Sequence, residues 1–484
     1  MDTINSITDP VDYFGKLLGL DRAGVCALVR NAIPGVEDGE VIFERKESES
    51  VSLDDRRVEA PSLSVDQGFG LRRVNGESVL YGYANEISKE EIVRFGDELA
   101  QMDGVKNSFI AIDGPPECAP CYSSELASLT LTKRVRLLRD IDRYARKDSA
   151  VTNVMATIAR GQVMSLVVRV DGAVTSDVRP MSVLSVAVQC EDGKKREMVR
   201  VGIGGRHDYG GVKKRSLWKP EVDRAIRIAK EKLRAVPCPS GEMPVVLGPG
   251  WAGVLLHEAI GHGLEGDAVW HKTTVFADLL GTRVASDLVT VVDDGTIVDA
   301  RGSLVVDDEG TSTERTVLIQ NGVLVGFMHD RQSARLLRMC PTGNGRRESF
   351  EHPPIVRMRN TLMLSGNTPP EEILARTEHG LYIESFGGGQ VDPVTGQFVF
   401  SCDHAYKIVN GKLGEPVVGA TLIGNCATVL LHVDLVGNDS RLGGVGTCGK
   451  DGQQVPVGIG QPTLRLSGGV AVGGTALTQT RGSE

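Results

Sequence analysis

The sequence lacks any long apolar segment. No stretch approaches the roughly 18 consecutive apolar residues of a membrane-spanning helix. The first twenty residues carry acidic side chains and have neither a basic region nor a sustained apolar core, so they do not resemble a secretory signal. We therefore expect no membrane span, no leader and a cytoplasmic location.

Aromatic residues and positive charge are also scarce. Only 5% of the residues are aromatic, and 54 Lys and Arg against 63 Asp and Glu give a net charge of −9, with no basic block or tail. Nucleic-acid binding usually requires a cationic face. The composition therefore predicts no direct nucleic-acid partner, and it does not exclude a peptide substrate.

Cysteine is sparse and odd in number. Nine cysteines are scattered over 484 residues, which fits reduced thiols better than a disulfide framework. Cys118 and Cys121 form one C-x-x-C pair, without the second pair of a structural metal site or the βαβ setting of a redox site. We interpret this pair as part of a loop.

Length and local signals predict several domains in an α+β fold. Asn75-Gly76 indicates a hairpin, and Ser88 with Glu91 forms a capping box before a helix. We expect a mixed α/β N-terminal region with antiparallel sheets, a central α+β domain, and a largely β C-terminal domain that carries one metal-binding helix. The predicted limits are 1–120, 121–238 and 239–484.

The central region reads as an antiparallel meander between two helices. One helix begins near residue 130 and the other spans Trp218 to Arg234. Beyond about residue 284 the chain is rich in strands, with Asn-Gly turns at 321–322 and 410–411. The meander strands are predicted at 151–159, 163–170, about 180–189 and 196–203, with the first turn at Arg160-Gly161.

The chemistry is concentrated in the segment WAGVLLHEAIGHGLEGD, residues 251–267. It resembles the zinc-binding pattern H-E-x-x-H, but His262 follows His257 by five residues instead of four. In a regular helix Glu258 lies at about 100° and His262 at about 140° from His257. The two histidines could converge on one ion only if the helix, expected to end at Gly261 and Gly263, unwinds or widens at Gly261.

Two other interpretations of this segment stay open at this point. In the first, His257 caps or packs, and Glu258 with His262 is a solvated i, i+4 pair. In the second, Glu258 is itself a metal ligand beside His262.

Four separated motifs resemble the TldD/PmbA family, and specifically its metal-bearing TldD branch. The similarity extends over nearly the whole chain, and the PmbA (TldE) branch lacks the H-E-x-x-x-H pattern. The motifs are HEAIGHGLEGD at 257–267, GNGRRESF at 343–350, RMRNTLMLSG at 357–366 and GTCGKDGQ at 446–453.

The resemblance implies a zinc-dependent peptidase that acts on unfolded or extended peptides. Zn²⁺ would be held by His257, His262 and Cys448, a donor set that leaves a fourth position for water, and Glu258 would be the general base. It also implies a dimer, with a PmbA/TldE-like paralogue or with a second copy. The alternative is a non-catalytic peptide-binding or regulatory subunit, as the relatives without the motif suggest.

Further acidic and polar residues are candidates for supporting roles. Glu265 and Asp267 lie close enough to orient a ligand histidine, whereas His271 is expected at the surface. An oxyanion stabiliser could be His329, His404, Tyr406 or a backbone N–H. We expect the acidic runs Asp293-Asp294 and Asp307-Asp308-Glu309 to be solvated turns, because the spacing of a calcium loop is absent.

Overall fold

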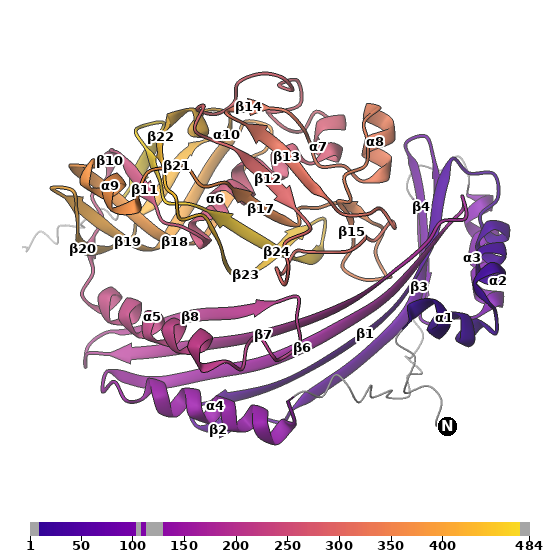
Figure 1. Ribbon diagram of the computed structural model, residues 1–484, viewed down its shortest axis with the longest axis horizontal. Coiled ribbons are helices and arrows are strands. Elements are labelled where there is room, and N and C mark those ends of the chain that lie inside the picture. Colours follow the sequence, from indigo (N-terminus) through magenta and orange to yellow (C-terminus); the bar gives the residue numbers. More distant parts are fainter. Residues whose placement is uncertain (1–8, 103–107, 113–128, 475–484) are drawn as a thin grey trace, which may run out of the picture.

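The computed structural model describes residues 9–102, 108–112 and 129–474. One curved sheet carries helices on its outer face, and a C-terminal region built on further sheets lies over its inner face (Figure 1). The predicted α+β class is confirmed. None of the described helices is long and apolar enough to cross a membrane.

In the described part of the chain, the curved sheet has eight strands in the order β5-β4-β3-β1-β6-β7-β8, with β2 beside β1. Neighbouring strands are antiparallel, except β4 and β5. The sheet joins strands from both sides of the predicted limit at residue 120, because β1 pairs with β3 and β6. The strands are β1 Asp38–Asp54, β2 Arg57–Val58, β3 Ser62–Asn75, β4 Ser78–Ala84, β5 Ser108–Ile112, β6 Val151–Arg169, β7 Val174–Glu191 and β8 Arg196–Gly205.

The predicted hairpin at Asn75-Gly76 and the antiparallel meander are confirmed. The predicted turn at Arg160-Gly161 is wrong, because both residues lie inside β6. Gly161 is paired with Ser48 of β1 on one side and with Met181 of β7 on the other. Ladder pairing on both sides holds this dipeptide in an extended conformation, and its turn propensity is overridden.

Helices cover the outer face of the curved sheet in two groups. α1, α2 and α3 pack over one end and α4 and α5 over the other (Figure 1). The capping box is confirmed, since the Ser88 side chain accepts a hydrogen bond from the Glu91 backbone N–H at 3.2 Å. The helices are α1 Pro10–Leu18, α2 Arg22–Ala32, α3 Lys89–Gln101, α4 Leu131–Ala145 and α5 Arg215–Leu233.

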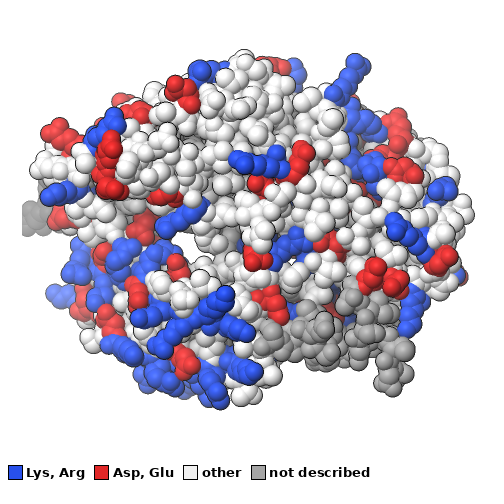
Figure 2. All heavy atoms as spheres, viewed as in Figure 1, with Lys and Arg blue, Asp and Glu red and all other residues white. Residues whose placement is uncertain are grey.

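Positive charge is unevenly distributed over this surface. Figure 2 shows Lys and Arg side chains gathered at the end of the molecule where α4 and α5 lie, although the whole chain is acidic. The apolar sides of both helices face the sheet, so their charged side chains remain outside. Exposed members of this group are Lys133, Arg136, Arg139, Arg143, Lys147, Lys214, Arg215 and Lys219.

The C-terminal region contains two larger sheets among its described residues. The ten-stranded one comprises β9 Val236–Pro237, β10 Gly241–Glu242, β11 Val245–Leu247, β18 His379–Val391, β19 Gln397–Val409, β20 Lys412–Val418, β21 Thr421–Asn425, β22 Val433–Val436, β25 Leu464–Leu466 and β26 Val470–Gly473. The six-stranded one comprises β12 Val291–Asp294, β13 Arg315–Gln320, β14 Val323–Leu324, β17 Asn360–Met363, β23 Arg441–Lys450 and β24 Gln453–Gln461.

Short elements complete this region. Strands β15 Gly345–Arg346 and β16 Ile355–Val356 form a two-stranded antiparallel sheet. The short helices are α6 Val254–Leu256, α7 Gly266–Trp270, α8 Arg331–Leu337, α9 Pro370–Ala375 and α10 Cys426–Val429, with 3-10 turns at Trp251–Gly253 and Leu430–His432.

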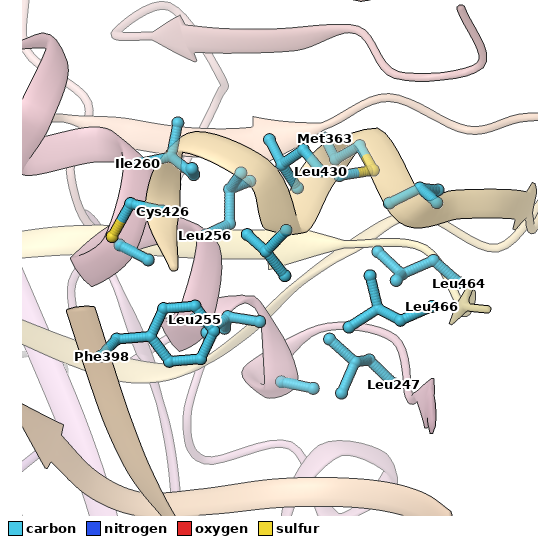
Figure 3. Packing of buried hydrophobic residues seen from close by; sticks show 14 of the residues in the cluster. Leu247, Leu255, Leu256, Ile260, Met363, Phe398, Cys426, Leu430, Leu464 and Leu466 are labelled. Atoms are coloured by element: carbon cyan, nitrogen blue, oxygen red, sulfur yellow. The ribbon is translucent and has the colours of Figure 1, made fainter. Parts of the chain in front are cut away.

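A short helical segment lies in the hydrophobic core between these two sheets. Leu255, Leu256 and Ile260 are buried in one cluster with residues of both, among them Phe398 of β19 and Met363 of β17 (Figure 3). Burial on both sides fixes the position of this segment, because any shift would open cavities in a close-packed interior. The His257-Glu258 motif lies within it.

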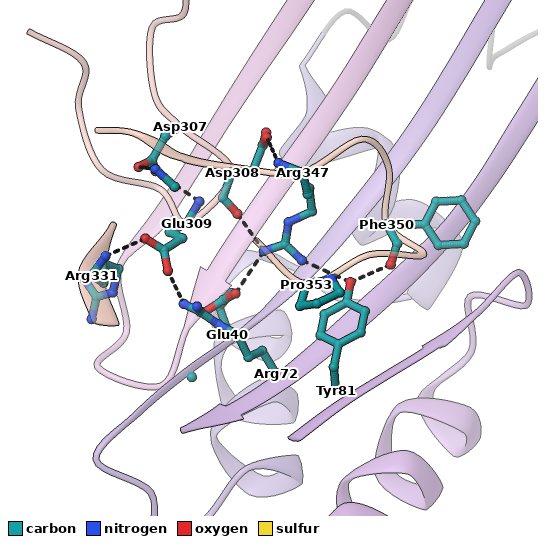
Figure 4. Close-up of polar contacts among 12 residues, drawn as sticks. Glu40, Arg72, Tyr81, Asp307, Asp308, Glu309, Arg331, Arg347, Phe350 and Pro353 are labelled. Carbon is teal, nitrogen blue, oxygen red and sulfur yellow. Dashed lines mark hydrogen bonds and ion pairs between the residues drawn. The ribbon is translucent and has the colours of Figure 1, made fainter. Parts of the chain in front are cut away.

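A buried ion-pair network joins the curved sheet to the C-terminal region (Figure 4). Arg72 of β3 pairs with Glu40 of β1 at 2.9 Å and with Glu309. Arg347 pairs with the same Glu40 at 2.9 Å and donates a hydrogen bond to the carbonyl oxygen of Asp308. The two regions therefore meet through matched buried charges.

The expectation that the two acidic runs are solvated turns is wrong. Asp293, Asp307, Asp308 and Glu309 are all buried. The carboxylate of Asp293 pairs with Arg359 at 2.8 Å, and Asp308 pairs with Arg179. These cationic partners are far away in the sequence, so the acidic runs alone resemble exposed turns.

Candidate metal centre

The helical path through His257–Leu264 changes form at the predicted point. After α6 the chain forms a π-helical turn, His257–Gly261, and then a 3-10 turn, His262–Leu264. The backbone N–H of His262 donates to the carbonyl oxygen of His257, an i→i+5 bond that closes a wider turn than an α-helix does. The sequence suggested that the helix ends at Gly261 and Gly263. In the structure the helix widens in the turn up to Gly261, and the chain stays helical to Leu264.

Gly261 packs closely against the side chain of Met358. A Cβ atom at this position would lie 2.2 Å from the sulfur of Met358. The glycine therefore allows the wide turn to lie directly against the segment that carries the arginine-rich motif 357–366.

The structure brings His257, His262 and Cys448 together. One possible ligand atom from each lies within 4.8 Å of the others. The Cys448 sulfur is 3.3 Å from His262 Nε2, and the two imidazole rings are 5.2 Å apart at an interplanar angle of 80°. Residues 186 positions apart in the chain thus converge, in an arrangement that can hold a metal ion.

The three side chains differ in their hydrogen bonding. His257 is buried, and neither ring nitrogen has a hydrogen-bond partner among the described residues. Burial raises the pKa of the Cys448 thiol, but the neighbouring His257 and His262 outweigh burial and lower it to about 5. The thiol is therefore readily converted to thiolate, the form that binds metal.

Glu265 orients His262, as the sequence suggested. Its Oε2 lies 3.0 Å from His262 Nδ1, which leaves Nε2 directed toward Cys448. Burial raises the pKa of Glu265, but the charges of Lys450 and His262 lower it to about 2, so the carboxylate is ionised. Asp267 does not contact His262 in this way. It is linked to Glu265 through Lys450, whose Nζ lies 2.6 Å from Asp267 and 2.9 Å from Glu265.

Lys450 is the residue that sequence analysis missed. It lies two positions after Cys448 on β23, and alternate residues of a strand share a face. This spacing, beside two carboxylates already under consideration, is the signal that could have identified it.

Glu258 lies at the edge of the cluster and is the more accessible group. Its side chain is 41% exposed, and its Oε2 is 3.7 Å from His262 Nε2. A partly exposed carboxylate beside the cluster can reach a water molecule and transfer a proton.

The arginine-rich motif supports the strand that carries Cys448. Arg357 is fully buried and donates to the carbonyl oxygens of Cys448 at 2.5 Å and of Gln453 at 3.2 Å. β23 and β24 form a hairpin at this point, with Cys448 opposite Val455. Three of the four recognised motifs therefore build one centre.

The candidate oxyanion stabilisers are engaged elsewhere. His404 lies 3.1 Å from both Glu384 and Glu231, and Tyr406 donates to Glu231. His329 is buried beside Ser333. In the described residues, no hydrogen bond or ion pair links these three to His257, His262 or Cys448. His271 is exposed, as expected, whereas Cys118 and Cys121 lie outside the described residues.

Comparison with known proteins gives matches along most of the chain. Models of the PmbA/TldA metallopeptidase domain 1, central domain and C-terminal domain match residues 39–102, 124–235 and 240–474. A metalloprotease TldD homolog of Haemophilus influenzae is 41% identical over 91% of this chain and 93% of its own length. A metalloprotease of Methanocaldococcus jannaschii is 32% identical over 87% and 93%. A zinc metalloprotease TldD homolog of Saccharolobus solfataricus is 32% identical over 47% and 51%.

Solved structures share the fold. TldE of Thermococcus kodakarensis is 17% identical, with a TM-score of 0.73 over 93% of this chain and 99% of that one. A Thermotoga maritima protein is 18% identical, with a TM-score of 0.74 over 90% and 96%. From the sequence matches, the chain belongs to the PmbA/TldD family of metallopeptidases.

Proposed function

We propose that this chain is a zinc-dependent peptidase that hydrolyses unfolded or extended peptides. The observation that carries the proposal is the convergence of His257, His262 and Cys448 within 4.8 Å. The Saccharolobus solfataricus relative is named a zinc metalloprotease, which supports zinc as the ion.

The donor set suits zinc. Two imidazoles and one thiolate are typical of catalytic zinc sites, which keep one position open. The buried nitrogens of His257 have no partner in the described residues, and an ion would supply one. When bound, zinc would polarise a carbonyl group and lower the pKa of a bound water toward about 7.

The chain's own residues would carry the proton transfers. Glu258 would accept a proton from the attacking water on a carboxylate oxygen and deliver it to the leaving amine. Glu265 would hold the Nδ1 proton of His262 and keep Nε2 available, while Lys450 would balance its charge.

The outer strand β23 suggests how an extended peptide would bind. Among the described strands it pairs only with β24, and the carbonyl oxygens of Gly446 and Cys448 accept bonds from Arg301 and Arg357, so a peptide would use the remaining backbone groups of its other edge. An extended peptide could add to this edge as a further strand, which would select unfolded chain. The relationship to TldE supports a dimer with a TldE-like paralogue or with a second copy.

We place this activity in the cytoplasm. The cysteines in the described ranges are unpaired, and several are buried, as expected of thiols in a reducing compartment.

Substitution of Glu258 tests the catalytic assignment. Glu258→Gln should retain zinc and lose at least about 100-fold in the rate of cleavage of an unfolded protein substrate, because the general base is removed. Zinc content and cleavage would be measured on the purified chain, alone and with its partner. Glu371→Gln on exposed α9 is the matched control and should behave as wild type.

The alternative is a non-catalytic peptide-binding subunit. It would be supported if wild type and Glu258→Gln bound peptide equally and neither cleaved it. Equal cleavage by both would instead remove Glu258 from the mechanism.

A further inference from the structure

A cavity of about 400 Å³ lies between the curved sheet and the C-terminal region. Val163 of β6 and Met181 of β7 contribute to one wall, and Thr447 and Pro456 contribute to the opposite wall. Figure 1 shows β23 and β24 passing over the inner face of β6 and β7.

This cavity is separate from the candidate metal centre. Thr447 pairs with Pro456, and the next pair along the hairpin is Cys448 with Val455. Successive side chains of a strand point to opposite faces. One layer of sheet therefore lies between the cavity and the metal-binding side chains.

The cavity walls carry an excess of positive charge. Six arginines and one lysine line it, against the acidic residues Glu44, Asp308 and Glu348. Four of the arginines have carboxylate partners: Arg160 with Asp208, Arg179 with Asp177 and Asp308, Arg206 with Asp177, and Arg347 with Glu40. The remaining two, Arg301 and Arg346, make no ion pair with any described residue.

These two guanidinium groups bond only to neutral oxygens. Arg301 donates to the carbonyl oxygen of Gly446 at 2.7 Å and to the Thr447 hydroxyl at 3.3 Å, and its buried Nη1 has no acceptor among the described residues. Arg346 donates to the carbonyl oxygens of Met358 and Pro456. Burial lowers the pKa of both arginines to about 10, so both remain cationic at neutral pH.

The rest of the lining is compatible with an anionic ligand that has an apolar body. Ala159, Val163, Met181 and Leu304 supply aliphatic surface. Burial, with the charge of Asp308, raises the pKa of Glu44 to about 7, so this carboxyl is partly protonated at neutral pH. The volume lies within the roughly 300–1,000 Å³ of small-molecule sites.

We propose that this cavity binds the C-terminal carboxylate of a short peptide, with Arg301 and Arg346 as the counter-charges of that carboxylate. A guanidinium group binds a carboxylate through two parallel hydrogen bonds.

Calorimetric titration of the metal-free full-length chain tests the proposal, because a peptide is then neither cleaved nor held by zinc. The probes are acetyl-Ala-Leu-Ala with a free carboxylate, the same peptide as its amide, and inorganic phosphate. We expect the free acid to bind and the amide to bind at least about tenfold more weakly, since a charged hydrogen-bond acceptor is lost. Phosphate, which lacks the apolar body, should also bind more weakly than the free acid.

Variants locate the binding. Arg301→Met should weaken binding of the free acid at least about tenfold, and Arg301→Lys should weaken this binding less. Arg139→Met on exposed α4 should leave the affinity for the free acid unchanged. Circular dichroism would establish that each variant is folded. His262→Ala should leave binding unchanged.

Several outcomes would overturn the proposal. Absence of binding, equal affinity for acid and amide, or phosphate binding as tight as the peptide acid would each do so. Binding that survives Arg301→Met but is lost in His262→Ala would place the peptide at the metal centre. All these titrations are made without zinc, so they are independent of any failure of the peptidase proposal.

Discussion

Two histidines of the C-terminal region, His262 and His329, differ in how their pKa values respond to their surroundings. Burial lowers the pKa of His262, but the charges of Glu265 and Cys448 raise it well above its ordinary value. His329 has no such charges, and burial lowers its pKa to about 4. The same desolvation is therefore compensated in one case and not in the other.

His329 should make the fold sensitive to moderate acid. Its unfolded form takes up a proton near pH 6.5 and its folded form only near pH 4. Between these values the unfolded state binds more protons, so the free energy of unfolding should fall as the pH drops, by up to roughly 3 kcal/mol. Chemical denaturation at a series of pH values would measure this loss.

His329→Gln should flatten the pH dependence between pH 6.5 and 4, whatever its effect on stability at pH 7. His379→Gln, at an exposed histidine, is the control and should keep the wild-type slope. An unchanged slope in His329→Gln would show that this side chain is not the source.

At the scale of single elements, the π-helical turn His257–Gly261 determines whether the two histidines can meet. Their five-residue spacing does not suit a regular α-helix, and one i→i+5 turn places both rings at one point. Such a turn lacks regular α-helical hydrogen bonds and depends on the surrounding packing to persist.

Gly261→Ala should disturb this turn. The added methyl group would meet the Met358 sulfur at 2.2 Å, and overpacking of this kind typically costs about 1–3 kcal/mol. We expect a lower melting temperature and weaker zinc retention on dialysis against a chelator. Gly449→Ala, beside Cys448 but with no atom beyond its chain neighbours within 4 Å of its new Cβ, is the matched control. Equal zinc retention by both variants would contradict the role given to the turn.

Local elements were predictable where a short sequence determines its own geometry. The Asn-Gly turns at 321–322 and 410–411 are confirmed, with positive φ at both residues of each pair. The Ser88 cap is confirmed for the same reason, since its partner Glu91 is three residues away. The break in β6 was wrong because pairing with β7 and with β1, which is distant in sequence, decides its length.

At the scale of the whole molecule, the buried charges around Arg72 hold the curved sheet against the C-terminal region. Arg72 neutralises Glu40 and Glu309, and all three side chains are nearly inaccessible. Such a network specifies which surfaces meet, because a mismatched arrangement would bury unpaired charge.

Arg72→Met should destabilise the protein by about 3–5 kcal/mol, because Glu309 would remain buried without its arginine and Glu40 would keep only Arg347. Arg94→Met removes two partly exposed helix ion pairs, with Glu91 and Glu98, and should cost less than about 1 kcal/mol. Urea denaturation of both variants gives the comparison. A similar small loss in the two would show that the Arg72 network is not a significant contributor to stability.

The candidate centre was predictable only in part, because many of its contacts join residues that are far apart in the sequence. The sequence pattern named His257, Glu258 and His262, and the family resemblance added Cys448. The structure now brings the two histidines and the cysteine together. Lys450 and the supporting Arg357 escaped prediction because their partners are separated from them by 91 to 185 positions, and some of these partners are backbone atoms. The buried acidic residues 307–309 were misjudged for the same reason.

Zinc stoichiometry tests the central claim most directly. Elemental analysis of the purified chain should find close to one zinc per wild-type molecule and little in Cys448→Ser, since a serine hydroxyl is a poor zinc ligand. Cys426→Ser, at another buried free cysteine, should retain the metal. Equal zinc in wild type and Cys448→Ser, or no zinc in wild type, would contradict the account.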